Sequence, residues 1–357
     1  MRRPAGARDG SARAASRKSR FPSLFGCAML RLPKIRLVSP RSLVAAARLL
    51  VEAGPEGAAL AGGTDLVPKL KRRQLRPRTL VDLSRVEGFS GVERRGGRVV
   101  IGAGTPIEEL LESPVLARLG ALREAAACVA TPQIRTSATV GGNLALDTRC
   151  SFYDQSGSWR EAQGFCLKTD QEAPCRAAVG SERCFAVASG DLAPALIALG
   201  AQVRLVGPVG EREAALAEIY QDTGRRSLRL KPGELIAAVE LDLDPRLSTY
   251  RKLRRRGSFD FAALGVAVSL QMKGGEVSAC RIVLGALASS PIIADEAATI
   301  MTGGKPTLER VAEAARAAVR RARPVDNADF PAAYRRRMAG IFVARALRDL
   351  TGLRGKP

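Results

Sequence analysis

The sequence predicts an α+β protein with a two-part N-terminal region followed by a C-terminal α/β region. Three observations support this class: a small βαβ-type unit near the N-terminus, a longer mixed region after it, and a final region where two long strands precede three helices. Segregated strands and helices are typical of α+β folds. With 357 residues, the chain is long enough for two or three domains and a large core.

The first unit alternates short strands and helices. Residues 35–38 predict a strand, and Ser39-Pro40 is expected to cap a helix, with the proline in its first turn, that runs to about residue 53 and stops at Gly54. The elements expected next are a strand over 58–61, a tight loop over 62–65, a helix through residue 70 and a strand over 79–83. This order predicts a βαβ-type unit.

The later elements follow from longer apolar runs. A second region runs from a strand near 99–101 past another at 203–206, and residues 235–241 lead toward the third region. The elements expected in the third region are strands at 262–272 and 277–287, then helices near 291–302, 307–322 and 331–350.

Composition excludes several kinds of chemistry. The chain has no histidine, which rules out a Ser-His-Asp triad, histidine-ligated zinc or haem, and a histidine general base. It has seven cysteines, an odd number, and no recognisable secretory signal, so we expect a reducing cytoplasm rather than a disulfide framework. No run approaches 18 consecutive apolar residues, so no membrane span is predicted.

The formal net charge of +22 admits three interpretations. Nucleic-acid binding is disfavoured because the basic residues are scattered and lack an aromatic stacking platform. Docking of an acidic protein by electrostatic steering is a second possibility. The sequence favours the third, a solvated arginine-rich surface, with docking as a local addition.

Residues 1–28 are basic, small and without pattern, and we expect them to be disordered. Arg2-Arg3 lacks the context of a transport signal. The true start is then either Met1 or Met29, with Met29 the simpler choice.

Two paired-glycine loops carry the clearest binding signal. Gly62-Gly63 lies between a predicted strand and helix, and Gly141-Gly142 forms a second such loop, preceded by a donor-rich stretch from Thr131 to Arg135. Glycines let backbone N–H groups approach a pyrophosphate, and a helix start favours its charge. Asp191 follows as a possible acceptor for ribose hydroxyls. One such loop most often only makes a turn, but two that converge on a ligand are much less common by chance.

These motifs resemble the FAD-binding subunits of the molybdenum hydroxylase family, which includes xanthine dehydrogenase and carbon monoxide dehydrogenase. The resemblance covers about residues 29–350. The motifs that carry it are Gly62-Gly63-Thr64-Asp65-Leu66, Thr139-Val140-Gly141-Gly142-Asn143-Leu144, Ser189-Gly190-Asp191-Leu192, Tyr250-Arg251-Lys252-Leu253-Arg254, Asp260-Phe261-Ala262, Gly285-Ala286-Leu287, Pro291 and Tyr334-Arg335-Arg336.

The resemblance implies a two-subdomain FAD domain of the PCMH/VAO type over 29–240, with subdomains about 29–87 and 88–240. A C-terminal domain over 245–352, like that of the carbon monoxide dehydrogenase flavoprotein, would follow. It implies non-covalent FAD and no catalytic residue in this chain; Lys252 would lie near the flavin ring. The expected FAD contacts are Gly62, Gly63, Thr64, Asp65, Leu66, Thr131, Thr139, Gly141, Gly142, Asn143, Asp191 and Lys252.

Four further cysteines lie in an insertion over about residues 146–188, between two of these motifs. Cys150, Cys166, Cys175 and Cys184 have the spacing C-x15-C-x8-C-x8-C. Four thiolates can hold zinc or a [4Fe–4S] cluster. Wide spacing without close cysteine pairs favours the cluster over zinc, and unrelated structural cysteines remain a third possibility.

The insertion is similar to that of one branch of the family, the 4-hydroxybenzoyl-CoA reductases. The similarity implies that these four cysteines ligate a [4Fe–4S] cluster. The other three, Cys27, Cys128 and Cys280, match no ligand position; we expect ordinary thiols there, with Cys128 and Cys280 buried.

This resemblance implies a heterohexamer with two copies each of three subunits. A large subunit would carry the molybdenum cofactor and the substrate site, and a small one two [2Fe–2S] clusters. Electrons from ferredoxin would enter at the [4Fe–4S] cluster and reach molybdenum through FAD and the [2Fe–2S] clusters, converting 4-hydroxybenzoyl-CoA to benzoyl-CoA. The partners would include neither nucleic acid nor membrane.

Three alternatives remain open. One is the FAD subunit of an aldehyde, xanthine or carbon monoxide dehydrogenase. The second is a zinc-stapled flavin-binding interaction protein without electron transfer. The third is a nucleic-acid-binding protein.

Overall fold

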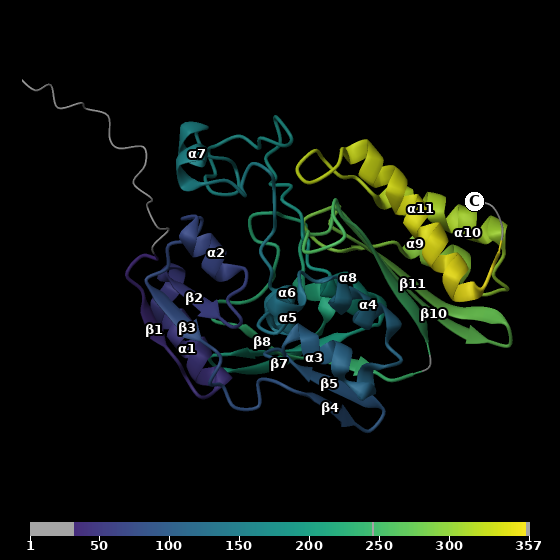
Figure 1. Cartoon of the computed structure of the whole chain (residues 1–357), viewed down its shortest axis with the longest axis horizontal. Coiled ribbons are helices and arrows are strands. Elements are labelled where there is room, and N and C mark those ends of the chain that lie inside the picture. Colours follow the sequence, from purple (N-terminus) through teal and green to yellow (C-terminus); the bar gives the residue numbers. More distant parts are fainter. Residues whose placement is uncertain (1–31, 245, 355–357) are drawn as a thin grey trace, which may run out of the picture. The chain divides into compact units, whose positions relative to one another are not determined.

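The computed structural model describes residues 32–244 and 246–354. The predicted basic extension over 1–28, the choice between Met1 and Met29, and Cys27 lie outside these residues. Within them, three sheets organise the chain (Figure 1). No helix in this part is long and apolar enough to cross a membrane.

The first sheet has three parallel strands in the order β1-β3-β2. They are β1 (Arg36–Val38), β2 (Gly57–Leu60) and β3 (Thr79–Asp82), joined through α1 (Leu43–Ala53) and α2 (Leu66–Lys71). The predicted βαβ-type unit is therefore confirmed. A short 3-10 turn, η1 (Gly54–Glu56), follows α1.

The start of α1 differs from the prediction. Ser42, not Ser39-Pro40, is the N-cap, and its hydroxyl accepts from the Ala45 N–H at 3.2 Å. Ser39 Oγ instead donates to Asp82 Oδ2 at 2.9 Å, so its hydroxyl bonds to strand β3 and does not cap the helix. Gly54 ends the helix as predicted, with a φ of +54° that suits glycine.

The second sheet has five antiparallel strands in the order β4-β5-β8-β6-β7. These strands are β4 (Val92–Arg95), β5 (Arg98–Gly102), β6 (Gln202–Gly207), β7 (Gly210–Ala215) and β8 (Leu235–Asp242). The predicted stretch 235–241 is thus the central strand of this sheet.

Short helices complete the core around this second sheet. They are α3 (Ile107–Glu112), η2 (Pro114–Leu116), α4 (Gly120–Cys128), α5 (Pro132–Arg135), α6 (Val140–Leu144), α8 (Leu192–Ala198) and η3 (Leu216–Ile219). Every residue of α8 is buried, which places the segment after Asp191 at the centre of the molecule's largest core.

The third sheet has the order β12-β11-β10-β9 and is antiparallel. The strands are β9 (Leu247–Leu253), β10 (Leu264–Lys273), β11 (Glu276–Gly285) and β12 (Ile292–Ile293). The two long strands match the predicted pair. The predicted helices are α9 (Asp295–Met301), α10 (Leu308–Arg321) and α11 (Ala332–Thr351).

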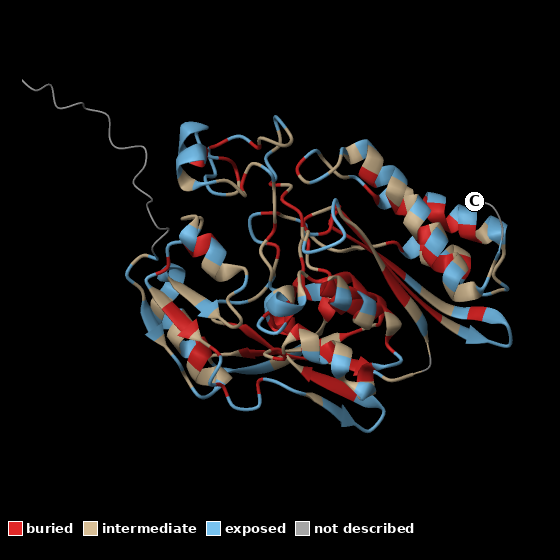
Figure 2. Ribbon diagram, in the orientation of Figure 1, coloured by how far each residue is buried: buried red, intermediate tan, exposed pale blue. Residues whose placement is uncertain are grey.

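These three helices and the third sheet share a second hydrophobic core. Figure 2 shows buried residues along β10 and β11 and on parts of α10 and α11, while the end of the β10–β11 hairpin is exposed. Helix α8 of the first core also packs on β10 and β11, and α4 packs on β9. The segment around Asp191 therefore contacts both cores.

Candidate cofactor sites

The two paired-glycine loops lie close together in the structure. Gly62 follows β2, and a Cβ added there would lie 1.7 Å from the carbonyl oxygen of Ser137, just before the second loop. Gly63 adopts φ +71°, which lets the chain turn into α2. Gly62 is therefore needed for the contact between the loops. The sequence pattern alone does not reveal this requirement for glycine.

The second loop lies on the end of β5. Thr139 caps α6, and its hydroxyl accepts from the Gly142 N–H at 3.1 Å. The Gly141 N–H donates to the Ala103 carbonyl at 2.7 Å, and a Cβ on Gly141 would lie 2.7 Å from that of Ala103. Upstream, Thr131 caps α5 in the same way, accepting from the Ile134 N–H.

The third predicted segment meets the second. A Cβ on Gly190 would lie 2.7 Å from the Asn143 carbonyl oxygen, and the Leu192 N–H donates to Asn143 Oδ1 at 3.1 Å. All three segments predicted to bind FAD thus converge on one region. Their close backbone approaches leave no room for a Cβ, so the glycines let the three segments pack against one another.

Both acidic residues among the predicted contacts already have protein partners. Asp65 pairs with Lys69 at 2.8 Å and with Arg149 at 3.6 Å. Asp191 is buried; its Oδ1 accepts from Tyr250 OH at 2.7 Å and its Oδ2 from Lys252 Nζ at 2.8 Å. The structure thus brings Asp191 and Lys252 together. Thr64 is exposed beside Asp65, and Leu66 begins α2.

The Asp191 group joins the FAD motif to β9 of the third sheet. Burial raises the pKa of Asp191, although Lys252 and the Tyr250 hydroxyl act in the opposite direction. Burial and the nearby carboxylate likewise raise the pKa of Tyr250. Lys252 also donates to the Cys128 carbonyl at 2.9 Å. Tyr250 was not among the expected site residues; its place in the tail motif beside Lys252 was the available signal.

We expect the substitution Asp191→Asn to destabilise the FAD-free chain by about 3–5 kcal/mol, because it leaves the Lys252 ammonium buried without its counter-charge. Urea unfolding measures the loss. Glu93→Gln, which removes an exposed pair with Arg95, serves as the control and should cause no measurable loss. Equal stability of the Asp191→Asn variant and the wild type would contradict the buried pair.

The two ends of the cysteine insertion are hydrogen-bonded to each other. Arg149 and Val187 form an isolated antiparallel bridge, with N–H to carbonyl distances of 2.9 and 2.7 Å. One helix, α7 (Gly157–Ala162), lies inside it and is capped by Ser156. The chain therefore leaves and re-enters the fold at one point, as an insertion between two motifs requires.

The four cysteines lie in one neighbourhood. Cys175 and Cys184 belong to a small separate hydrophobic core, Cys150 packs against it, and Cys166 is buried. Burial raises the pKa of Cys150 to about 11, although the N–H groups of Phe152 and Tyr153 lower it. Burial also raises the pKa of Cys184, against an N–H from Ala186.

This arrangement allows a test of the metal alternatives. In the part of the chain that the structure describes, no three cysteine or acidic side chains stand close enough together to hold a metal ion. A single zinc with bonds of about 2.3 Å needs four sulfurs nearly in contact. Three of the four thiols are buried and Cys150 is half-buried, and backbone N–H groups act on the sulfurs of Cys150 and Cys184. An iron–sulfur cluster is larger than a zinc ion and would accept thiolates that stand further apart.

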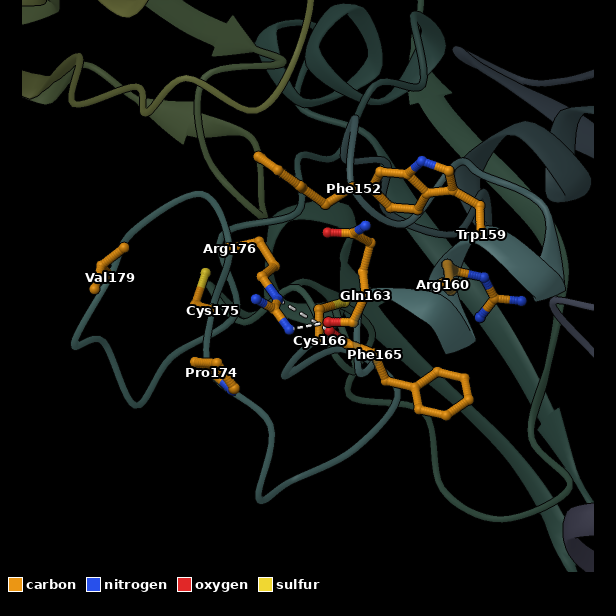
Figure 3. Close-up of a pocket in the computed structure, with 10 residues that line it drawn as sticks. All are labelled: Phe152, Trp159, Arg160, Gln163, Phe165, Cys166, Pro174, Cys175, Arg176 and Val179. Atoms are coloured by element: carbon orange, nitrogen blue, oxygen red, sulfur yellow. Dashed lines mark hydrogen bonds between the residues drawn. The ribbon is translucent and has the colours of Figure 1, made fainter.

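A pocket of about 340 Å³ opens beside two of these cysteines (Figure 3). Cys166 and Cys175 line it, together with aromatic and basic side chains. Arg176 Nε donates to the Phe165 carbonyl at 3.2 Å and thereby ties two parts of the wall together. Trp159 is partly exposed at the rim. The pocket thus lies beside two of the cysteines, and its lining is mostly apolar, with two arginines, Arg160 and Arg176.

The remaining thiols differ from the prediction in burial. Cys128 and Cys280 are half-buried, not buried. Cys128 is the last residue of α4, and Cys280 lies in the half of β11 where exposed and half-buried positions dominate. Neither belongs to the small cysteine core.

Comparison with known families gives two matches that together span nearly all described residues. Residues 33–242 match the model of the FAD binding domain in molybdopterin dehydrogenase. Residues 248–350 match the carbon monoxide dehydrogenase flavoprotein C-terminal domain. The predicted α+β class, with these two kinds of domain, is confirmed.

Individual relatives agree. The carbon monoxide dehydrogenase medium chain of Afipia carboxidovorans is 33% identical over 86% of this chain and 93% of its own. The aldehyde oxidoreductase FAD-binding subunit of Escherichia coli is 34% identical over 69% of this chain and 80% of its own.

A solved structure of the Cu,Mo-CO dehydrogenase superposes with a TM-score of 0.75 at 29% identity. It covers 90% of this chain and 99% of the matched chain. With both domain models matched in order, the chain belongs to the FAD-binding subunits of the molybdenum hydroxylase family.

Proposed function

We propose that this chain is an electron-transfer subunit that holds a [4Fe–4S] cluster in addition to FAD. The observation that carries the proposal is a loop closed at its base in which the four cysteines lie near one another: Cys175 and Cys184 share a small core, Cys150 packs against it, and Cys166 lines a pocket with Cys175. Cys150, Cys166, Cys175 and Cys184 are the proposed ligands. Bound there, the cluster would exchange one electron at a time.

FAD is proposed to bind non-covalently where the three loop segments converge. The backbone of the Gly62-Gly63 loop would face the pyrophosphate, the second loop would pack beside it, and Asp191 and Lys252 would lie at the inner end. The proposed contacts are Gly62, Gly63, Thr64, Asp65, Leu66, Thr131, Thr139, Gly141, Gly142, Asn143, Asp191 and Lys252. The domain boundaries at 29–240 and 245–352 are part of this proposal.

The chain is proposed to work within a larger complex. Its relatives are described as a medium chain, an FAD-binding subunit and a complex subunit. We expect a molybdopterin-binding large subunit, which carries the substrate site, and a small subunit with two [2Fe–2S] clusters. Holding and tuning redox groups requires no acid–base catalyst here, which suits a chain without histidine.

For the substrate, we propose reductive removal of the hydroxyl of 4-hydroxybenzoyl-CoA to give benzoyl-CoA, because the cysteine insertion resembles that branch of the family. The second candidate is the FAD subunit of a dehydrogenase for carbon monoxide, an aldehyde or xanthine, which the named relatives favour.

The purified three-subunit complex distinguishes the two candidates. We expect it to form benzoyl-CoA from 4-hydroxybenzoyl-CoA with reduced ferredoxin. Reduction of NAD with an aldehyde, xanthine or carbon monoxide, without benzoyl-CoA formation, would establish the second candidate instead. Zinc without iron in protein purified under anaerobic conditions would overturn the cluster.

The proposed donor is ferredoxin, an acidic protein, arriving at the cysteine insertion. Exposed Arg225 and Arg226 follow Gly224, where an added Cβ would lie 2.7 Å from Cys184 Sγ. The charge of +22 and these local arginines would steer an acidic partner.

We expect reduction by ferredoxin to slow by about ten-fold between low and physiological ionic strength. Arg225→Gln combined with Arg226→Gln should flatten this dependence, whereas Arg94→Gln combined with Arg95→Gln on strand β4 should leave it unchanged. Stopped-flow reduction measures the rates. A flat salt response of the wild type would count against this docking.

A further inference from the structure

Lys168 makes hydrogen bonds that connect three of the four segments carrying the cysteines. It lies two residues after Cys166, and its side chain is almost fully buried. Its Nζ donates to Asp147 Oδ1 at 2.8 Å and to Thr148 Oγ1 at 2.7 Å, just before Cys150. The same Nζ donates to the Gly224 carbonyl at 2.6 Å.

Gly224 connects this lysine to Cys184. Its N–H donates to the Cys184 carbonyl at 2.8 Å, and its Cα packs against the Cys184 sulfur so closely that a Cβ would lie 2.7 Å away. One buried ammonium group thus fixes the segments that carry Cys150, Cys166 and Cys184.

A second buried lysine extends the chain of charges to the first paired-glycine loop. Lys69 lies in α2 with its side chain 1% exposed, and its Nζ contacts Asp147 Oδ2 at 3.1 Å and Asp65 Oδ2 at 2.8 Å. Charges therefore alternate along Asp65, Lys69, Asp147 and Lys168. Burial by itself would raise the pKa of Asp147, but the two lysines lower it.

The turn after helix α2 also contacts the insertion. Gln74 Nε2 donates to the Tyr153 carbonyl at 2.9 Å, and Arg160 donates to the Arg73 carbonyl at 3.2 Å. Helix α2 therefore contacts both sides: its Val67 N–H donates to the Gly63 carbonyl and its Lys69 pairs with Asp147, while the turn after it bonds to the insertion.

We propose that the ion-pair chain Asp65–Lys69–Asp147–Lys168 couples the flavin site to the cysteine site, so that filling either one tightens binding at the other. This inference rests on the proposed function. A ligand that binds at one site orders α2, which also contacts the other site. Less of the protein then remains to be ordered when the second ligand binds, so the loss of conformational entropy is smaller. If either loop moves away, Lys69 loses one of its two carboxylate partners while its ammonium group stays buried.

The test uses the full chain in four states: without cofactors, with FAD, with iron and sulfide, and with both. Flavin fluorescence gives the FAD dissociation constant, and metal analysis gives iron content. In the wild type, FAD should bind about five-fold or more tightly when the cysteine site is filled, and iron should be retained longer against a chelator when FAD is bound.

Lys69→Met is the informative variant because it removes only the middle of the chain. Asp147 keeps Lys168, and Asp65 keeps Arg149. Both cofactors should still bind, but the ratio of FAD dissociation constants should fall to about one, the value for uncoupled sites. Arg98→Gln, which removes surface pairs with Glu240 and Asp242, should keep the wild-type ratio.

The outcomes separate the two proposals. A wild type that takes up no iron overturns the cluster, and the coupling with it. A wild type that binds both cofactors with an FAD affinity independent of iron overturns the coupling alone, and so does a Lys69→Met chain with the full wild-type ratio. If Lys69→Met does not fold, the wild-type comparison and the variant Gln74→Leu still decide, since Gln74→Leu removes the bond from the turn after α2 to the Tyr153 carbonyl and should lower the ratio.

Discussion

Replacing Cys184 with alanine should reduce bound iron from about four atoms per chain to nearly none, because the proposed [4Fe–4S] cluster would lose one of its four thiolate ligands and become labile. The same loss is expected for Cys150, Cys166 and Cys175. Iron and sulfide analysis after anaerobic purification, together with loss of the broad visible absorbance beneath the flavin bands, measures it. FAD should still bind when flavin is in excess, since the paired-glycine loops remain.

The controls for this prediction are Cys128→Ala and Cys280→Ala. Both thiols are half-buried and lie outside the small cysteine core, so both variants should keep wild-type iron. A Cys184→Ala chain with undiminished iron would contradict the proposed ligand set. Iron loss in the Cys280→Ala variant would point to a ligand set outside the insertion.

Replacing Gly62 with alanine should abolish FAD binding and lower the unfolding free energy by about 3 kcal/mol. The added Cβ would lie 1.7 Å from the Ser137 carbonyl oxygen, a backbone atom that cannot rotate away. The two loops would have to separate, and the site between them would open. Flavin content after purification and urea unfolding measure the two effects.

Gly97→Ala is the matched control for this substitution. Nothing lies within 4 Å of a Cβ at Gly97, and its φ is outside the left-handed region, so flavin content and stability should not fall. A Gly62→Ala chain that retains FAD would show that the loops can separate without harm. The glycine would then serve only the local turn.

Much of the fold could be predicted because its signals are local. The Gly54 helix end, the βαβ-type unit and the β10–β11 strand pair follow from patterns within a few residues. The N-cap of α1 could not be predicted as easily, because Ser39 and Ser42 are equivalent in local chemistry. Only the approach of Asp82, 43 residues away, directs the Ser39 hydroxyl elsewhere.

The candidate sites divide in the same way. Residue type alone indicated glycine loops for a phosphate-bearing ligand and thiols for a metal cluster. It did not indicate that Asp191 and Lys252 form a buried pair, because β9 reaches α8 only through packing of the third sheet on the first core. The burial of Lys69 and Lys168 could not be predicted for a similar reason: an isolated lysine in a sequence is usually a solvated surface residue.

The sequence by itself determined the family, the order of the domains, and the donor chemistry available to a chain with four clustered cysteines and no histidine. These depend on which atoms each residue carries and on short spacings, which folding does not change. Only the tertiary structure decided that the Gly62 loop meets Ser137, that Arg149 and Val187 close the insertion, and that two buried lysines both pair with Asp147. The reason is physical: a lysine enters the interior only where folding brings a carboxylate to it, and that partner can lie anywhere along the chain.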